Sequence, residues 1–220
     1  MAATIDNSGL TFGNGTKQVS APSSSADYGQ LISITTFTSN GTYTAPANCR
    51  RVLVKVQGGG GGSAGHCEGG GAGGYSERLI HNITPGTTVA VTIGGGGGGV
   101  GYYAAAGRGG TSSFGSLISA TGGYGANNNQ GHGGGHGGSG SGGQIQLDGG
   151  TGAGHGNSAS NGQPAGGGPS FFGGPGGQYR STTPSNYSPA LGSGATGGRT
   201  NDGGSGTGAP GGVCVVYAYT

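Results

Sequence analysis

The chain has little charge, no tryptophan and no long apolar runs. Only 6% of its 220 residues are charged, and 8 Lys or Arg against 6 Asp or Glu give a net charge of +2. Hydrophobic types make up 30% of the chain, with one Met and five Phe, whereas ordinary globular domains contain roughly 45–50% apolar residues. These shortages exclude a conventional side-chain core over the whole length.

The same shortages exclude several kinds of partner and location. A nearly neutral chain gives no reason to expect nucleic acid or an acidic membrane as a partner, and no apolar run approaches the length of a membrane-spanning helix. The start, MAATIDNSGL, has neither a basic n-region nor an apolar h-region, so we expect no secretory signal. Cys49, Cys67 and Cys214 are odd in number and irregularly spaced, which favours synthesis in a reducing cytosol over a disulfide framework.

No catalytic constellation is visible. The acidic residues lie far apart in the sequence and form no paired motif: Asp6, Asp27, Glu68, Glu77, Asp148 and Asp202. Gly-x-Gly-x-x-Gly matches carry no information where glycine is this abundant, and none opens a helix after a strand as a dinucleotide site requires. We therefore expect a protein that is not an enzyme and needs no cofactor.

Glycine dominates what is present, with 63 residues. A flexible insertion is one interpretation, and a bundle of polyglycine II helices is the other. Such helices have three residues per turn and no internal hydrogen bonds, so their peptide groups bond sideways to neighbours. Three-residue glycine registers do occur, but glycine is so frequent that they permit a bundle without establishing it. They are Gly131/134/137/140/143, Gly95/98/101/107/110 and Gly59/62/65/71/74.

Strand signals precede the longest glycine-rich stretch. The segment LISITTFTSNGTYTAP is dense in β-branched and aromatic residues, with a hairpin-type Asn40-Gly41 in its middle. In RRVLVKVQ, the residues Val52, Val54 and Val56 alternate with Leu53 and Lys55, which is the period of a strand with one apolar face.

Further strand signals follow on both sides of the glycine-rich stretch. YSERLIHNITPGTTVAVTI predicts strand, Pro-Gly turn and strand, with one apolar face formed by Val89, Val91 and Ile93. TSSFGSLISA offers three residues for burial, Phe114, Leu117 and Ile118, and GGVCVVYAYT supplies a last strand.

These signals predict a mainly β fold. We expect a small antiparallel β-sandwich or sheet from residues 31–121 and 211–220. A glycine-rich insertion over 122–210 would leave the sheet and return to it as an irregular, polyglycine II-like body. Glycine costs about 1 kcal/mol per residue in a helix and no segment has a 3.6-residue period, so we expect no significant helix.

A short N-terminal motif resembles an element of bacteriophage tail fibres. GLTFGNGTKQVSAP matches that element at Leu10, Thr11, Phe12, Asn14, Gly15, Thr16 and Gln18. The resemblance implies that residues 1–30 attach the protein to the tail or fibre, near regions of trimeric packing. It also implies a location in the virion after synthesis in the host cytoplasm.

A longer resemblance covers about residues 36–220. The order of strands, Pro-Gly turn, Ser-Phe-Gly element and glycine runs, closed by GGVCVVYAYT, is similar to the glycine-rich domain at the ends of many phage tail fibres. It is also similar in kind to the distal adhesins of T-even phages, in which a polyglycine II sandwich carries receptor-binding loops. The resemblance favours an ordered glycine-rich body, although this chain lacks the attachment domain of those adhesins.

Loops between glycine runs supply the candidates for receptor binding. Exposed rings stack on sugars or apolar patches, and tyrosine adds a polar end. The alternative is that each ring only covers the edge of the glycine bundle, and Arg108 and Arg199 are further candidates for anionic groups. The candidates are Tyr102, Tyr103, Tyr124, Asn127, Asn128, Asn129, Phe171, Phe172, Tyr179, Arg180 and Tyr187.

The histidines raise the question of a metal site. His132, His136 and His155 lie among glycines and His66 adjoins Cys67, but zinc needs three or four converging ligands at defined spacing. No Cys-x-x-Cys exists, so we expect no metal. One histidine per chain meeting at a trimer axis is the alternative.

Taken together, these features predict a structural phage tail-fibre or tail-tip protein that binds the surface of its bacterial host. Its partners would be other tail or baseplate proteins, a bacterial glycan or outer-membrane protein, and two further copies in a homotrimer. A connector subunit without receptor contact is the structural alternative. An ice-binding polyglycine II protein is a third, although such a protein needs a flat face of regularly spaced Thr or small residues.

Overall fold

The computed structural model describes the backbone of three short N-terminal strands and most of the rest of the chain. The N-terminal strands are β1 (Thr4–Asp6), β2 (Gly9–Thr11) and β3 (Lys17–Gln18), which pair antiparallel in the order β1-β2-β3. The larger described ranges are 29–65, 68–101, 104–127, 133–154, 165–174, 190–197, 209 and 211–220. They contain no helix, which confirms the predicted mainly β fold for these residues.

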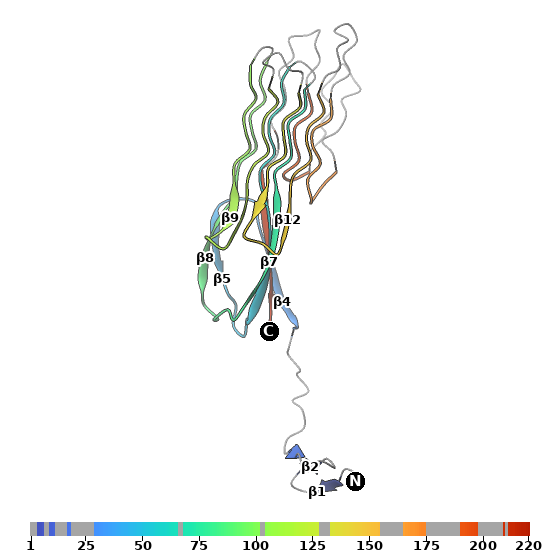
Figure 1. Ribbon diagram of the computed structural model, residues 1–220. Coiled ribbons are helices and arrows are strands. Elements are labelled where there is room, and N and C mark those ends of the chain that lie inside the picture. The colour runs from blue at the N-terminus through green and yellow to red at the C-terminus, as the bar shows by residue number, and fades with distance from the viewer. Residues whose placement is uncertain are drawn as a thin grey trace.

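Two five-stranded antiparallel sheets form a sandwich (Figure 1). Sheet I has the order β12-β7-β6-β13-β4, and sheet II has the order β11-β10-β9-β8-β5. The strands of sheet I are β4 (Leu31–Phe37), β6 (Arg51–Gln57), β7 (Tyr75–His81), β12 (Ile145–Leu147) and β13 (Val213–Tyr219). Those of sheet II are β5 (Gly41–Thr44), β8 (Thr88–Thr92), β9 (Ser112–Phe114), β10 (Ile118–Ala120) and β11 (Gly140–Ser141).

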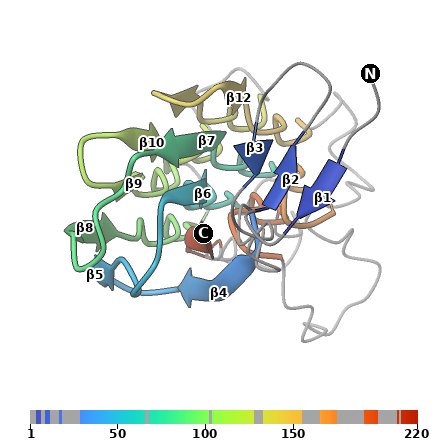
Figure 2. The same cartoon turned by 90° about the horizontal axis from the view of Figure 1, so that it is seen from below.

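The core lies between the two sheets, which Figure 2 shows from below, along the strands. Sheet I contributes the β-branched face of β6 and one face of β13: Val52, Val54, Val56, Cys214, Val216 and Ala218. Sheet II contributes Tyr43, Val91, Phe114, Ile118 and Ala120. Alternation in the sequence therefore identified the buried face of β6. It was wrong for Leu117, which is 36% exposed in the turn between β9 and β10.

The predicted hairpin at Asn40-Gly41 is also wrong. Strands β4 and β5 do not pair, because β4 pairs with β13 in sheet I and β5 pairs with β8 in sheet II. The bend between them carries the chain from one sheet to the other. The Asn40 side chain accepts a hydrogen bond from the Ile93 backbone (2.7 Å), which ties the bend to the end of β8.

Beyond the sandwich, the strands continue into glycine-rich segments that lie side by side (Figure 1). Residues 58–65 extend β6, and residues 68–74 return directly into β7; both segments are buried at every described position. They form the centre of a bundle. The outer segments surround this centre in sequence order: 94–101, 104–111, 121–127, 133–139, 148–154, 165–170, 190–197, and residues 209 and 211–212.

Backbone hydrogen bonds connect these segments with a period of three residues. In segment 68–74, Gly69 and Ala72 donate to one neighbour (Ala153 and Gly150), Gly70 and Gly73 to a second (Ala195 and Gly192), and Gly71 and Gly74 to a third (Tyr124 and Thr121). The outer ring closes where Gly212 donates to Gly94 (2.8 Å). Lateral bonding with this period is the polyglycine II arrangement.

Glycine is needed here for close approach and not for unusual backbone angles. No described residue of 58–65 or 68–74 has a positive φ. A β-carbon on Gly61 or Gly70 would instead overlap a carbonyl group of a neighbouring segment. Each lateral hydrogen bond contributes about 0.5–1.5 kcal/mol and each Cα–H···O contact about 0.5–1, which is comparable with the ordering cost of about 1–2 kcal/mol per residue.

The inward register differs between segments. Gly59, Gly62, Gly71 and Gly74 are buried, as a shared interior register predicts. Gly95 and Gly98 face outward with open space around them, and the buried positions of that segment are Gly94 and Gly97. The glycine register in the sequence therefore identified the interior only in part.

Candidate functional site

One side of the bundle forms a surface on which side chains recur every three residues. It consists of segments 104–111, 121–127 and 133–139, which we call the flat face. Segment 121–127 bonds to both central segments, since Gly123 donates to Gly59 and Gly71 donates to Tyr124. Its neighbours on the ring lie on either side, so the three segments cover the centre as one layer.

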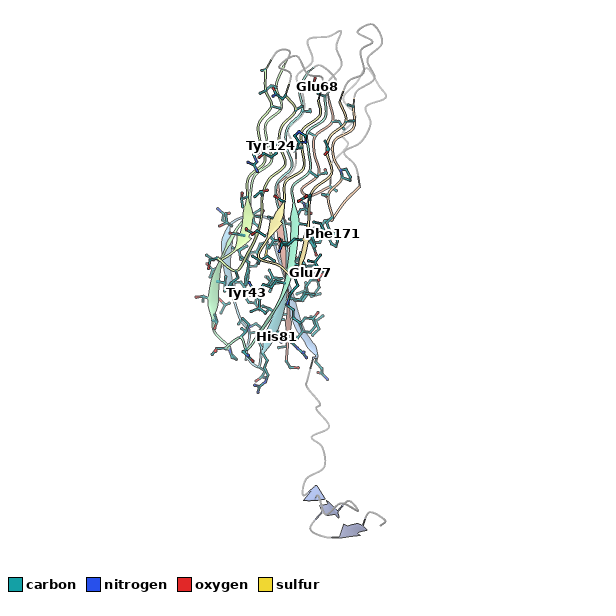
Figure 3. The ribbon with its side chains drawn as sticks, in the orientation of Figure 1. Tyr43, Glu68, Glu77, His81, Tyr124 and Phe171 are labelled. Atoms are coloured by element: carbon teal, nitrogen blue, oxygen red, sulfur yellow. The ribbon has the colours of Figure 1, made fainter. Side chains whose placement is uncertain are left out.

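The middle row of the flat face is Arg108, Tyr124 and His136, all exposed. Backbone bonds fix the row, because Gly109 donates to Gly123 (2.9 Å) and Tyr124 donates to His136 (2.8 Å). The Arg108 guanidinium carbon lies 4.0 Å from the Tyr124 ring centroid, and Nε of Arg108 donates to the Gly122 carbonyl (3.2 Å). Figure 3 shows Tyr124 on the side of the bundle, well above the sandwich.

Smaller polar groups flank this row. Three hydrogen bonds join Thr121 and Ser139. Ser139 N donates to Thr121 Oγ1 (2.8 Å), the same hydroxyl donates to the Ser139 carbonyl (3.3 Å), and Thr121 N donates to that carbonyl as well (2.9 Å). On the other flank, Asn127 forms backbone bridges to Ala105 and Gly133. Three residues at about 3.1 Å each place successive rows about 9 Å apart.

Two of the predicted receptor-binding residues, Tyr124 and Asn127, therefore share one surface. Sequence reasoning did not place Arg108 and His136 beside Tyr124. That arrangement depends on how three separate segments align. The sequence does show that side chains recur every three residues in each of these segments. This period predicts a shared row only when it is known which segments are neighbours.

Phe171 lies elsewhere, at the junction of bundle and sandwich (Figure 3), and Phe172 follows it in the same turn. The Phe171 ring stacks on Tyr75 (centroids 3.7 Å apart, planes at 16°), and Phe172 meets Tyr75 edge-on (5.8 Å, 71°). Phe171 remains 51% exposed. Burial, followed by the hydrogen bond from the Tyr75 hydroxyl to Glu77, raises the pKa of Tyr75 above its ordinary value. Both rings therefore pack on Tyr75 at the start of β7 and are not part of the flat face.

The remaining receptor-binding candidates lie outside the described residues. They are Tyr102, Tyr103, Asn128, Asn129, Tyr179, Arg180 and Tyr187. The described segments on either side of 102–103 and 128–132 end at the tip of the bundle, away from the sandwich (Figure 1).

The attachment candidates are described only in part. Leu10 lies in β2 and pairs with Gln18 of β3 and with Ile5 of β1. Phe12, Asn14, Gly15 and Thr16 lie outside the described residues. The motif therefore folds back on itself as the centre and edge of a small antiparallel sheet.

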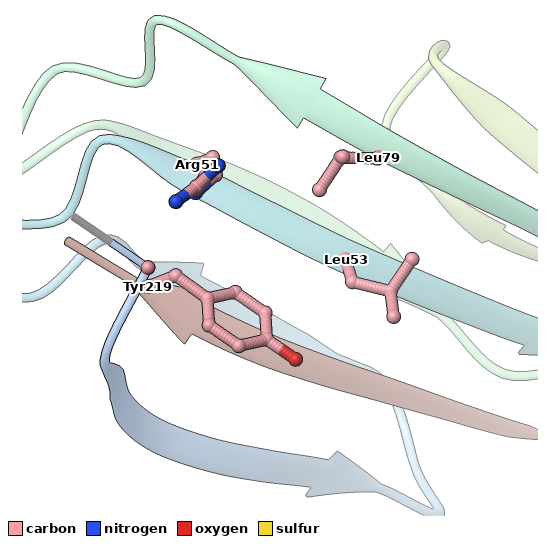
Figure 4. Close-up of a pocket in the computed structure, with 5 residues that line it drawn as sticks. Arg51, Leu53, Leu79 and Tyr219 are labelled. Carbon is pink, nitrogen blue, oxygen red and sulfur yellow. The ribbon is translucent and has the colours of Figure 1, made fainter.

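The outward face of sheet I is apolar. A row across four strands contains Leu79, Leu53, Tyr217 and Ile34, and Ile34 is 55% exposed. Beside it, Arg51, Leu53, Leu79 and Tyr219 line a pocket with Gly29 (Figure 4). The Lys55–Glu77 ion pair (3.6 Å) lies next to this row, and Lys55 Nζ stands 5.5 Å from the Tyr217 ring centroid.

The described part of the chain contains no group of three His, Cys, Asp or Glu side chains able to hold a metal ion. None of its segments is a helix long and apolar enough to cross a membrane.

These features define a class: an antiparallel β-sandwich whose strands extend into a polyglycine II bundle with side chains displayed on its outside. The model of the family described as "Glycine-rich domain" matches residues 35–218, and the chain belongs to this family. A comparison with curated proteins finds no match.

Proposed function

We propose that the protein is a component of a bacteriophage tail fibre or tail tip that binds the surface of the bacterial host. The observation that carries the proposal is the bundle itself. Its interior is hydrogen-bonded backbone, so it holds exposed side chains such as Arg108, Tyr124 and His136 on rigid supports. The N-terminal motif around Leu10 and Gln18 and the order of glycine-rich elements support a fibre origin through their resemblance to tail fibres.

The mechanism is reversible, multivalent binding without catalysis. Several weak sites on one particle gain avidity because the first contact raises the effective concentration of the others. Residues 1–30 attach to another tail protein, and the body over 31–220 meets a surface glycan or an outer-membrane protein. The flat face carries Arg, Tyr and His in place of repeated Thr, which does not favour ice binding.

The apolar outer face of sheet I supports a homo-oligomer, and we favour the trimer common in fibres. Exposed apolar patches on soluble proteins mark interaction surfaces. The row through Ile34 and Leu53 is continuous across strands, and β4 beside it is an edge strand. A second copy that covers this face would bury both the apolar row and the edge strand β4.

Adsorption competition tests the host-binding proposal. Purified full-length protein should bind the bacterial host and block adsorption of virions that carry it. Virions in which residues 102–103, 128–132 and 155–164 are each replaced by two glycines should adsorb poorly, provided that the altered protein is still incorporated. Normal adsorption by such particles, together with no competition by the purified protein, would show a connector subunit instead.

A further inference from the structure

The middle row of the flat face has the chemistry of an anion-binding sugar site. We propose that Arg108, Tyr124 and His136 bind an acidic polysaccharide, whose carboxylate or phosphate group meets Arg108 while a sugar ring packs beside Tyr124. This inference rests on the proposed host-binding function and names the ligand class and the side chains.

The Arg108 guanidinium is held in place before any ligand arrives. Its Nε donates to the Gly122 carbonyl, and its carbon stands 4.0 Å from the Tyr124 ring centroid. Its terminal NH2 groups have no hydrogen-bond or ion-pair partner among the described residues. A planar guanidinium binds carboxylate or phosphate through two parallel bonds, and ordering it in advance lowers the entropic cost of binding.

Tyr124 supplies the apolar contact. The ring is 47% exposed, with the Arg108 guanidinium over it. A tyrosine ring offers a flat apolar surface and a hydroxyl at low entropic cost. His136, on the next segment, adds a ring nitrogen for hydrogen bonding, and its position is fixed by the bond from Tyr124 N to the His136 carbonyl.

The electrostatic setting favours an anion. Segments 104–111, 121–127 and 133–139 contain no Asp or Glu, so Arg108 is not neutralised on its own face. Lys55 in the sandwich, by contrast, is paired with Glu77 (3.6 Å). Asp148 begins the next segment of the ring, and Glu68 is buried in the central segment 68–74.

The shape of the face selects an extended polymer. The layer is formed of three adjacent antiparallel segments, with Asn127 about 9 Å to one side of the middle row and Thr121 about 9 Å to the other. A chain lying along the segments can contact successive rows. One arginine is too little charge for a nucleic acid, since nucleic-acid affinity comes from neutralising several phosphates.

The experiment measures binding of the full-length protein to soluble polymers by biolayer interferometry. The probes are alginate for carboxylates, poly(glycerol phosphate) for phosphates, dextran as the neutral polymer and double-stranded DNA as a charge-only polyanion. We expect binding to alginate or to poly(glycerol phosphate), which identifies the anionic group, and little to dextran or DNA. Stronger binding to DNA than to both acidic polymers would overturn the proposal.

Matched variants locate the site. Arg108→Gln and Tyr124→Ala should each weaken acidic-polymer binding by about tenfold or more. Arg108→Lys should have an intermediate affinity, because lysine keeps the charge but loses the pair of parallel N–H donors of the guanidinium. Arg50→Gln removes the same charge from an exposed position of the sandwich and should bind like the parent. Equal losses in Arg50→Gln, or unchanged binding by both flat-face variants, would refute the site. Circular dichroism melting checks that each variant is folded.

Cell adsorption separates this inference from the proposed function. If the parent and both flat-face variants block virion adsorption equally, host binding stands and the flat-face site is refuted. If the parent binds acidic polymers through Arg108 but never binds cells, the site stands and the host-binding role fails.

Discussion

A β-carbon on Gly71 would overlap the carbonyl oxygen of His136, on the neighbouring segment. The spacing is closer than the 3.0 Å that real β-carbons respect, and the obstacle is backbone that cannot rotate away. A β-carbon on Gly98, which lies on an outer segment, would have open space around it. The two glycines therefore provide a test of what stabilises the bundle.

Gly71→Ala should lower the free energy of unfolding by about 3 kcal/mol or more, because overpacking against rigid backbone is costly. Gly98→Ala should be neutral or stabilise by about 0.4–1 kcal/mol, since it only restricts the unfolded chain. Urea unfolding followed by circular dichroism measures both. Equal losses in the two variants would contradict a close-packed backbone interior.

Gln57→Leu should destabilise the junction of sandwich and bundle. The Gln57 side chain is fully buried; its Nε2 donates to the carbonyls of Gly73 (2.7 Å) and Gly74 (3.0 Å), and its Oε1 accepts from Phe171 N (3.2 Å). With leucine, the Gly73 carbonyl and Phe171 N lose these bonds, at about 1–3 kcal/mol for each buried group that finds no new partner. The Gly74 carbonyl keeps its bond from Gly58 N (2.9 Å). Gln146→Leu on exposed β12 is the control and should change the unfolding midpoint little.

Stability should decline at alkaline pH. Burial raises the pKa of Cys214 from 9.0 to about 12, and burial, with a smaller effect of Cys49, raises that of Tyr43 from 10.0 to about 12. Above about pH 9 the unfolded chain loses these protons while the folded protein keeps them, so stability is full below pH 9 and falls as pH approaches 12.

Urea unfolding at pH 8, 9.5 and 11 measures this decline. A Cys214→Ala variant should show a shallower fall than the parent between pH 9 and 11, because one of the raised groups is gone. A parent protein whose stability is constant from pH 8 to 11 would be incompatible with these raised pKa values.

Association through sheet I should fail when its outer face is charged. An Ile34→Lys, Leu53→Lys double variant should sediment as a monomer where the parent sediments as a trimer, because burying two unpaired charges is unfavourable. Tyr124→Lys, on the flat face, should leave the sedimentation coefficient unchanged. A trimer that persists in the double variant would place the interface elsewhere.

The sequence predicted those features of the sandwich that depend on local alternation. Val52, Val54 and Val56 are buried because one face of a period-two strand meets the core. The turn at Gly142, which joins β11 of sheet II to β12 of sheet I, was not indicated, since only Ile145 and Leu147 mark β12 and both are exposed at a sheet edge. The bend at Asn40 looked like a hairpin because local sequence does not show which sheet each flanking strand joins.

The bundle and its flat face were harder to predict. Glycine is so frequent that every register looks permissible, and the inward register is set by which segments become neighbours. Arg108 and Tyr124 are 16 positions apart in sequence yet meet because Gly109 bonds to Gly123. Such contacts follow from the closed ring of segments and leave no local signature.

The strands of the sandwich pass without interruption into the bundle, as β6 does into residues 58–65 and residues 68–74 do into β7. A tensile force along this axis would act in shear on many lateral bonds at once and would not open them one after another. The fold is thus mechanically suited to transmit a pull between its two ends while its outer side chains remain in place.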